Sequence, residues 1–209
     1  MDLLHIIFLI AITAEAMSAA ILGMRREMDL FGICLLGTVT GLGGGTVRDL
    51  VLNHHPISWV GNPEYLLFTA GAAVVTAYLA RYAHRLRGLF LFVDGLGLVA
   101  FTVIGCNIGL SEGVHPTIAV LAGVITGIFG GLLRDIIVNE VPLVLRRDLY
   151  ATVAFFTGGL YVGMLGLKVN MEIATLIALA AGFSFRLLAL RFQWHLPSFN
   201  GEGIKGFDD

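Results

Sequence analysis

Residues 37–56 read GTVTGLGGGTVRDLVLNHHP, and residues 123–142 read GVITGIFGGLLRDIIVNEVP. When the two stretches are aligned at a shift of 86 residues, nine of the twenty positions are identical, and most of the others are aliphatic in both copies. Identity at this density over one fixed shift indicates an internal duplication rather than chance. The fold is therefore expected to contain two copies of one structural unit.

The composition indicates that the chain lies in a membrane. Hydrophobic residues make up 57% of its 209 residues, charged residues only 13%, and the mean hydropathy is +0.87. Soluble domains carry about 25% charged residues, so this chain has too little polar surface to cover a water-soluble globule. A membrane-spanning helix needs about 20 apolar residues, and helices satisfy their own backbone groups in lipid. Apolar runs, the third of them short, occupy residues 3–23, 30–52, 65–80, 88–106, 116–138, 149–167 and 173–190.

Each copy of the duplicated unit contains three of these runs, which is an odd number. The second copy is therefore expected to cross the membrane in the opposite direction, as in the inverted repeats of transporters. We predict an all-α membrane protein of seven transmembrane helices, with repeats at about residues 1–83 and 88–168 and an extra helix at about 172–191. These form one transmembrane domain, residues 1–197, and residues 198–209 form a cytoplasmic tail.

The basic residues predict the orientation of the chain. Those that follow the first, third, fifth and seventh runs are Arg25, Arg26, Arg81, Arg85, Arg87, Arg146, Arg147, Arg191 and Lys205. Only Lys168 lies on the opposite side. Because basic residues collect on the cytoplasmic side, the N-terminus is expected outside and the C-terminus in the cytoplasm. Tyr, Trp and Arg residues near the ends of the runs are expected to be interfacial anchors.

Glycine clusters at residues 41–45 and 127–131 interrupt the second and fifth runs. Each interior glycine costs a helix about 1 kcal/mol relative to alanine, so both helices are predicted to kink or unwind there. An unwound helix would expose carbonyl groups that can bind a cation and amide groups that favour an anion, beside water. Close helix packing through small residues is the alternative.

A charged pair follows each cluster, Arg48-Asp49 in the first copy and Arg134-Asp135 in the second. A charge at the centre of a spanning helix costs roughly 2.5–3.5 kcal/mol, so such residues usually face a partner or a cavity. At about 1.5 Å per residue, the two arginines lie roughly 20 Å apart in depth. Pairing of each arginine with the aspartate of the other copy is therefore not expected, unless unwinding closes the distance.

Asp94 is a better partner for Arg134, because it lies about 9 Å along the fourth run and thus in the same leaflet. We predict an Arg134–Asp94 pair that plugs or shapes the inner half of a pathway, with a purely structural ion pair as the alternative. The repeat equivalent of Asp94 is Phe8, so Arg48 has no matching acid.

Glu15 lies about 18 Å into the first run, close to the middle of the membrane. It could bind a passing cation, carry a proton, or accept a hydrogen bond as a neutral acid. His54 and His55 are expected in a solvated turn rather than in a metal site. Neither a cofactor nor a metal is expected, and the net charge of −2 gives no reason to expect nucleic acid as a partner.

Several stretches resemble those of a known family. They are residues 28–32 (MDLFG), 41–49 (GLGGGTVRD), 94–101 (DGLGLVAF), 127–135 (GIFGGLLRD) and 139–144 (NEVPLV). Together they resemble the bacterial relatives of the trimeric intracellular cation channels, a group that also goes under the name glycine transporter domain. The resemblance extends over about residues 1–197, and the doubled glycine and Arg-Asp motif makes it specific.

The resemblance implies a homotrimer in lipid, in the bacterial plasma (inner) membrane, with one pore in each protomer. It also implies kinked second and fifth helices and passive conduction of monovalent cations such as potassium. With the two acids found above, the candidate residues of the ion pathway are Glu15, Gly43, Gly44, Gly45, Arg48, Asp49, Asp94, Gly130, Gly131, Arg134 and Asp135.

One departure from the family pattern falls in the first run. Many relatives carry an aspartate where this chain has Phe8 and an apolar residue where it has Glu15, whereas a subgroup has the Ala-Glu-Ala-Met-Ser pattern of residues 14–18. The exchange bears on what lines the pore and on which species passes through it.

Two functions fit inverted repeats with interrupted helices. The first is a cation channel, and the second is a secondary transporter of glycine or a similar small amino acid, with Glu15 or Asp94 binding the ammonium group. A small pore would favour the channel, and two alternately open vestibules would favour the transporter. An intramembrane enzyme is not expected, because the sequence contains neither Gly-x-Ser-x-Gly nor His-Glu-x-x-His.

Overall fold

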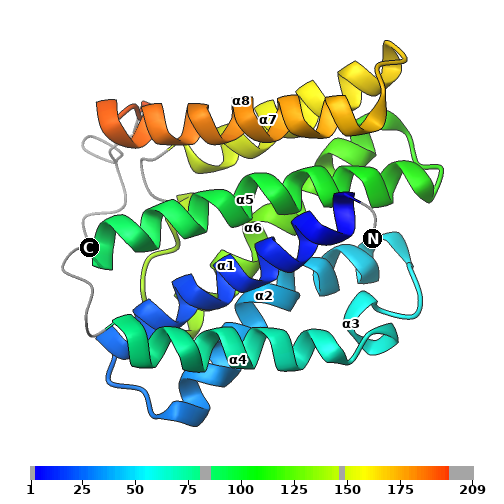
Figure 1. Cartoon of the computed structure of the whole chain (residues 1–209). Coiled ribbons are helices and arrows are strands. Elements are labelled where there is room, and N and C mark those ends of the chain that lie inside the picture. The colour runs from blue at the N-terminus through cyan, green and yellow to red at the C-terminus, as the bar shows by residue number, and fades with distance from the viewer. Residues whose placement is uncertain (1–2, 81–85, 146–148, 198–209) are drawn as a thin grey trace, which may run out of the picture.

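The computed structural model describes residues 3–80, 86–145 and 149–197, and all the regular structure there is helical (Figure 1). The helices are α1 (Leu3–Arg25), α2 (Leu30–Leu52), α3 (Ser58–Gly61), α4 (Glu64–Leu79), α5 (Leu86–Ser111), α6 (Pro116–Ile137), α7 (Tyr150–Gly166) and α8 (Met171–Phe192), with a 3₁₀ turn at Leu143–Leu145. Apart from the single turn α3, each α-helix lies at one of the predicted apolar runs. The predicted tail and the basic residues Arg81, Arg85, Arg146, Arg147 and Lys205 lie outside the described residues.

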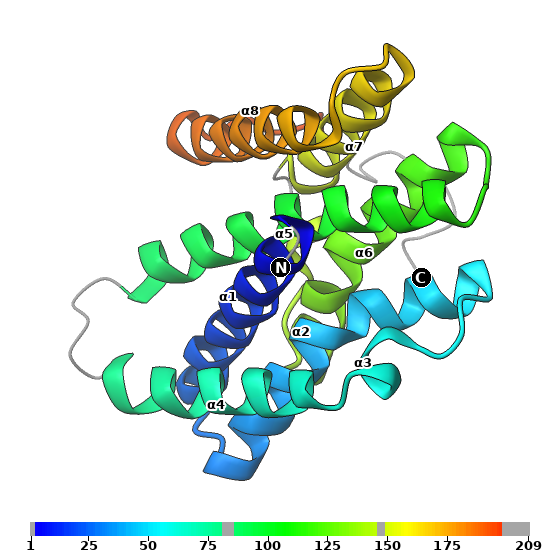
Figure 2. The same ribbon diagram turned by 45° about the vertical axis from the view of Figure 1, so that its right-hand side comes forward.

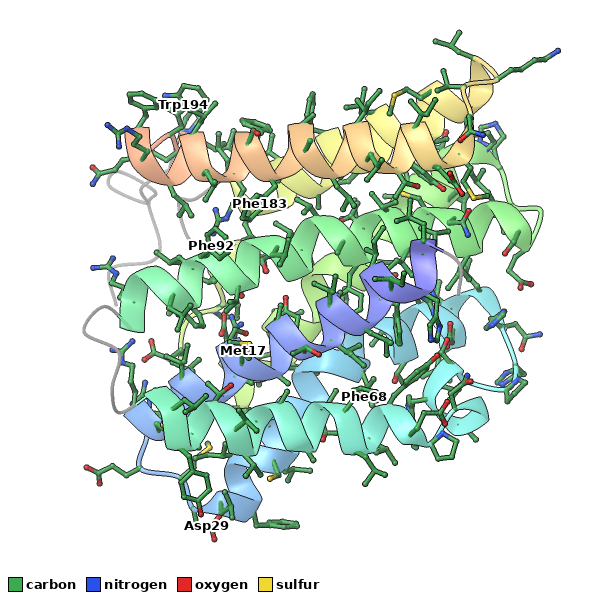
Figure 3. The ribbon with its side chains drawn as sticks, in the orientation of Figure 1. Met17, Asp29, Phe68, Phe92, Phe183 and Trp194 are labelled. Atoms are coloured by element: carbon green, nitrogen blue, oxygen red, sulfur yellow. The ribbon has the colours of Figure 1, made fainter. Side chains whose placement is uncertain are left out.

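The described helices are those of a membrane protein. By length and composition, α1, α2, α5, α6 and α8 can each cross a bilayer, and the apolar helices α4 and α7 are shorter, with 16 and 17 residues. Many large apolar side chains are exposed, among them Phe68, Phe92 and Trp194, each more than 45% exposed (Figure 3). A surface of this kind is stable in lipid, where apolar side chains need no cover.

The helices form two groups of three with the same internal contacts. In the first group α1, α2 and α4 all pack against one another, and in the second α5, α6 and α7 do the same. The groups meet where α2 packs on α6 and α1 packs on α5, while α8 covers α7 and α5 (Figures 1 and 2). The duplication seen in the sequence is thus repeated in the packing.

Both copies of the motif also end in the same turn. Asn53 and Asn139 both have a φ of 55°, a left-handed conformation that asparagine adopts more readily than most residues. In each copy the next backbone N–H donates to a carbonyl oxygen at 2.8 Å, that of Asp49 in the first copy and that of Asp135 in the second. Equivalent sequences therefore produce equivalent helix ends.

The predicted unwinding of the helices at the glycine clusters is wrong, because α2 and α6 are α-helical through both clusters. The glycines instead permit a close crossing of the two helices. A Cβ atom on Gly44 would lie 2.1 Å from the carbonyl oxygen of Thr126, and one on Gly130 would lie 2.3 Å from that of Thr40. These contacts are related by the repeat, and they match the packing alternative. In both ribbon views α2 changes direction along its length, so it bends without losing its helical structure (Figures 1 and 2).

Candidate functional site

Arg134 is the centre of a buried polar network, and its side chain is fully buried. Its Nη1 donates to Asp94 Oδ1 at 2.6 Å and to Ser18 Oγ at 2.8 Å, and its Nε donates to Asp135 Oδ1 at 2.8 Å. The guanidinium also lies over the ring of Phe90, 4.8 Å from its centroid. The predicted Arg134–Asp94 pair is therefore confirmed as a contact. Charge-assisted bonds of this kind are about twice as strong as neutral ones.

Glu15 belongs to the same network, although its position in the sequence does not predict this contact. Its Oε2 lies 3.7 Å from Arg134 Nη1 and accepts a hydrogen bond of 3.2 Å from Ser18 Oγ. Its Oε1 has no hydrogen-bond partner among the described residues and packs against α5, where a Cβ atom on Gly97 would lie 2.3 Å away. Glu15 is thus an acid beside Arg134 that the arginine does not bond directly.

Arg48 has different partners from its repeat equivalent Arg134. Its Nε and Nη2 donate to Asp49 Oδ1 at 2.9 and 2.5 Å, and Nη2 also donates to Ser58 Oγ at 3.0 Å. Asp49 Oδ2 in turn accepts from the backbone N–H and the hydroxyl of Ser58, at 2.8 and 2.7 Å. In the part of the chain that the structure describes, neither arginine pairs with the aspartate of the other copy, as expected.

Asp49 and Asp135 form equivalent hydrogen bonds in the two copies. Asp135 Oδ2 accepts from the backbone N–H of Leu143 at 2.9 Å, just as Asp49 accepts from Ser58. Each aspartate therefore binds its own arginine with one oxygen and fixes the loop after Pro56 or Pro142 with the other. Without these contacts the backbone N–H groups of the half-buried Ser58 and the buried Leu143 would lose their acceptors.

Two cavities enter this part of the molecule. The Asp135 cavity has a volume of about 540 Å³, and the Arg48 cavity one of about 430 Å³. The lining of the first includes Ile21, Leu22, Arg25, Arg87, Phe90, Asp135 and Glu140, and that of the second includes Leu4, His5, Phe8, Arg48, His54 and Ile104. Both cavities therefore border α1, the second near its start and the first near its end.

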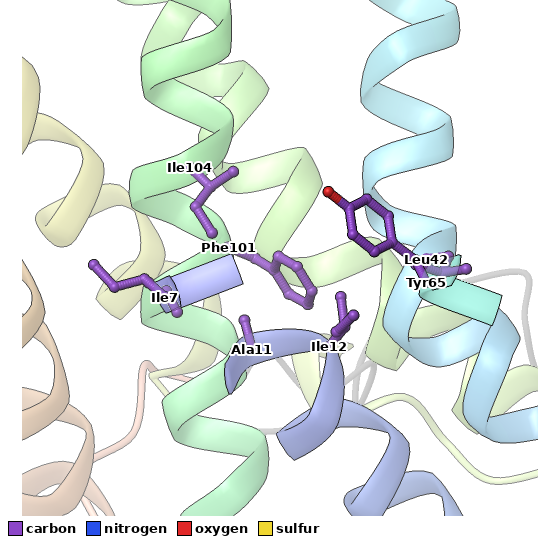
Figure 4. Close-up of a cluster of buried hydrophobic side chains, with 8 residues drawn as sticks. Ile7, Ala11, Ile12, Leu42, Tyr65, Phe101 and Ile104 are labelled. Atoms are coloured by element: carbon purple, nitrogen blue, oxygen red, sulfur yellow. The ribbon is translucent and has the colours of Figure 1, made fainter. Parts of the chain in front are cut away.

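Apolar packing separates the two cavities in the described chain. Next to the Arg48 cavity lies a buried cluster to which α1, α2, α4 and α5 contribute Ile12, Leu42, Tyr65 and Phe101 (Figure 4). A separate small cavity of about 10 Å³ is lined by Leu42 and Phe101 of this cluster and by Thr126 at the crossing of α2 and α6. The Arg134 network lies on the other side of the crossing of α2 and α6.

The repeat relates the surroundings of the two arginines in an unexpected way. At a shift of 86 residues, Phe8 corresponds to Asp94 and Phe101 corresponds to Glu15. Phe8 and Phe101 lie together beside Arg48, with ring centroids 6.2 Å apart, whereas Asp94 and Glu15 lie together beside Arg134. Equivalent positions thus carry two aromatic rings at one arginine and two acids at the other.

Comparison with known proteins identifies the family. The family described as Glycine transporter matches residues 5–81 and 91–166, two stretches whose starts lie 86 residues apart, which is the shift of the internal repeat. The chain belongs to this family. The inner membrane protein YadS of Escherichia coli K12 is 36% identical over 186 residues, which cover 88% of this chain and 90% of YadS.

Solved structures of the glycine transporter family's relatives share the fold. A trimeric intracellular cation (TRIC) channel orthologue from Rhodobacter sphaeroides is 36% identical and superposes with a TM-score of 0.89, over 92% of this chain and all of that one. A second TRIC cation channel is 32% identical, with a TM-score of 0.86 over 95% of this chain and 98% of that one. The resemblance to the bacterial TRIC family is confirmed, and the names of these relatives describe transport rather than catalysis.

The site also contains three residues that the sequence analysis does not single out, namely Ser18, Tyr150 and Arg186. Tyr150 is the first residue of α7, where interfacial anchors are expected, and Arg186 lies inside α8, yet both are almost completely buried. The Arg186 guanidinium lies 4.9 Å from the ring centroid of Tyr150. An arginine inside an apolar run is a signal that could have found Arg186, but nothing in the sequence points to Ser18 or Tyr150.

Two exposed ion pairs bridge the copies at opposite ends of the molecule. Arg26 pairs with Glu140, and His54 Nδ1 lies 2.6 Å from Glu112 Oε1. Arg26 and Glu112 are repeat equivalents, as are His54 and Glu140, so the two pairs correspond to each other. His54 is thus partly exposed in a turn, as predicted, and within the described residues no group of three or more side chains could hold a metal ion.

Proposed function

We propose that the chain forms a passive channel for monovalent cations of the potassium type, with one pathway through each protomer of a homotrimer. The observation that carries this proposal is that two cavities from opposite ends approach one buried charged network along the same helix, α1. The likeness to TRIC cation channels, with a TM-score of 0.89, supports the same class of function.

The pathway would follow one face of α1. Phe8, Ile12, Glu15, Ser18 and Leu22 recur at steps of three and four residues, which places them on one side of a helix. Phe8 lines the Arg48 cavity and Leu22 the Asp135 cavity, so this face links the two. The glycine crossing of α2 and α6 would form the opposite wall.

The structure corresponds to a closed state in this proposal. A cation that enters from the Arg48 cavity meets the apolar cluster around Phe101, and one from the Asp135 cavity meets the guanidinium of Arg134. Apolar constrictions and fixed positive charges are both effective barriers to cations. Opening would require Arg134 to leave Asp94, together with a small separation of α2 and α6.

The membrane arrangement that accompanies this proposal has seven crossings and two inverted repeats. The repeats cover about residues 1–83 and 88–168, followed by the extra helix α8, within one domain of residues 1–197. The N-terminus lies outside and the tail in the cytoplasm, so the Asp135 cavity opens inward and the Arg48 cavity outward. Arg25 and Arg87, which line the Asp135 cavity, support this orientation.

The test is ion flux in liposomes that contain the purified protein and a potassium gradient. Rapid potassium flux in the absence of glycine, with none in protein-free liposomes, is the expected result. A parallel assay with radiolabelled glycine examines the alternative, a secondary transporter. Saturable glycine uptake without an uncoupled potassium leak would overturn the channel proposal.

A further inference from the structure

Most of the unsatisfied polar atoms in the described chain gather in one place. Eight buried side-chain nitrogen or oxygen atoms have no hydrogen-bond partner there, and seven of them belong to the surroundings of Arg134. These seven are Glu15 Oε1, Asp94 Oδ2, Arg134 Nη2, Tyr150 Oη and the three guanidinium nitrogens of Arg186. Buried polar groups normally have partners, so each exception requires an explanation.

The formal charges of this cluster do not cancel. The acids are Glu15 on α1, Asp94 on α5 and Asp135 on α6, and the bases are Arg134 on α6 and Arg186 on α8. With all five ionised, the sum is −1. Arg25 of α1 and Arg87 of α5 line the Asp135 cavity together with Asp135, but both are exposed. Among the other described helices packed on α1, α2 has an arginine and an aspartate that pair with each other at the far cavity, and Glu64 is exposed at the start of α4, so neither helix adds a buried charge to the cluster.

A buried excess charge of this kind calls for a bound cation. The described residues contain no group of three or more His, Cys, Asp or Glu side chains placed to hold a metal ion, and Glu15 Oε1 packs directly on α5 at Gly97. Arg134 Nη1 forms an ion pair with Glu15 at 3.7 Å, but it donates its hydrogen bonds to Asp94 and Ser18, so Glu15 shares one cation with two other acids. A proton is the cation that needs no extra space.

We propose that the cluster of Glu15, Asp94 and Arg134 is a site for one exchangeable proton, carried by the carboxyl group of Glu15. With the proton bound the cluster is neutral, and Arg134 stays on Asp94 and Asp135. When the proton leaves, the Glu15 carboxylate competes for the guanidinium and draws it along α1, away from Asp94. The Asp135 cavity reaches the second aspartate of the network, so protons exchange from that side.

The consequence for conduction rests on the proposed function. Since Arg134 blocks the pathway while it bonds Asp94, loss of the proton opens the channel. Potassium flux is therefore expected to rise about tenfold when the pH on the side of the Asp135 cavity is raised from about 5.5 to 8.5. The proton site itself does not require that the protein conduct potassium, so the two statements can be tested apart.

The first experiment detects the proton directly, by infrared spectroscopy of the reconstituted wild-type protein over this pH range. A carbonyl band of a buried carboxylic acid, lost as the pH rises, is expected in the wild type and in the control Glu27→Gln, which changes an exposed acid of the α1–α2 loop. The band should be missing in Glu15→Gln. A wild-type spectrum without a titrating carboxylic acid band would overturn the proposal, as would a band that persists in Glu15→Gln.

The second experiment measures potassium flux of the same proteins against pH. Flux through Glu15→Gln should not change with pH, because the amide resembles the protonated acid. Arg186→Gln removes a positive charge from the cluster and should shift the midpoint of the pH dependence to higher pH. If the infrared band behaves as expected and no protein conducts potassium, the proton site stands and the channel function fails. An unchanged pH dependence of flux in Glu15→Gln would overturn the proposal even if conduction is confirmed.

Discussion

The two arginines of the repeat occupy equivalent positions and have unlike surroundings. Arg48 is satisfied by Asp49 and Ser58, which are near it in sequence, and two phenylalanine rings lie beside it. Arg134 bonds its own neighbour too, but it also binds Asp94 and Ser18 from two other helices. The duplicated motif thus fixes the helix end and the loop, whereas the first helix of each copy decides whether the arginine becomes part of a wider network.

The largest difference between the copies should appear on removal of the arginines. In Arg134→Gln, Asp94 and Asp135 lose a buried cationic partner, and truncation of one member of a buried pair typically costs 3–5 kcal/mol. In Arg48→Gln, Asp49 keeps two hydrogen bonds from Ser58, so the loss of stability should be smaller. Thermal unfolding of the purified proteins in detergent measures both. Equal losses would contradict the view that only Arg134 anchors a network.

The glycine crossing offers a comparison between glycines that contact the partner helix and one that does not. Gly44→Ala and Gly130→Ala place a methyl group against a backbone carbonyl oxygen and should cost about 1–3 kcal/mol or more through overpacking. Gly45→Ala is the matched control, because its nearest neighbour would be Arg48 Nη2 at 3.7 Å and alanine favours the helix. The midpoint of thermal unfolding should fall for the first two variants and stay or rise for the third. A similar drop for Gly45→Ala would mean that the cluster matters as a whole rather than at the crossing.

The helices and the Arg134–Asp94 contact are predicted from the sequence because both follow from local rules, namely apolar run length and rise per residue. The structural role of the glycines is not predicted from the sequence, because a glycine cluster looks the same in a sequence whether it breaks a helix or lets two helices pack closely. Thr40 and Thr126, which decide between these, lie far apart in the chain. Glu15 and Arg186 carry a signal as charges inside apolar runs, but only the packing of α1 and α8 on α5 brings them to Arg134.

Asp94, which binds Arg134, has no acidic counterpart at Arg48, and the variant Asp94→Asn tests the role of this acid. The exchange replaces a charge-assisted bond, worth about 1.5–3 kcal/mol, by a weaker one. If the pair plugs the pathway, potassium flux in liposomes should rise about tenfold, since 1.4 kcal/mol corresponds to a factor of ten. Glu172→Gln, at an exposed acid in the first turn of α8, is the control and should leave the flux unchanged. Wild-type flux and stability in Asp94→Asn would rule out any role of the pair.

The smallest effects are expected at the two exposed pairs, and they differ in kind between the two ends. His54–Glu112 is an ion pair only while the imidazole is protonated, whereas Arg26 keeps its charge at all pH values of interest. Removal of Glu112 or of Arg26 therefore tests one pair at each end of the molecule.

Exposed pairs contribute at most about 1 kcal/mol, so Glu112→Gln and Arg26→Gln should each lower the midpoint of thermal unfolding by a few degrees at most. Because the two pairs lie at opposite ends of the molecule and share no partner, the double variant should lose the sum of the two effects. Thermal unfolding of the purified proteins in detergent measures all three. A loss as large as that of Arg134→Gln in either single variant would show that an exposed pair stabilises the fold as strongly as the buried network, and the contrast between buried and exposed pairs would then fail.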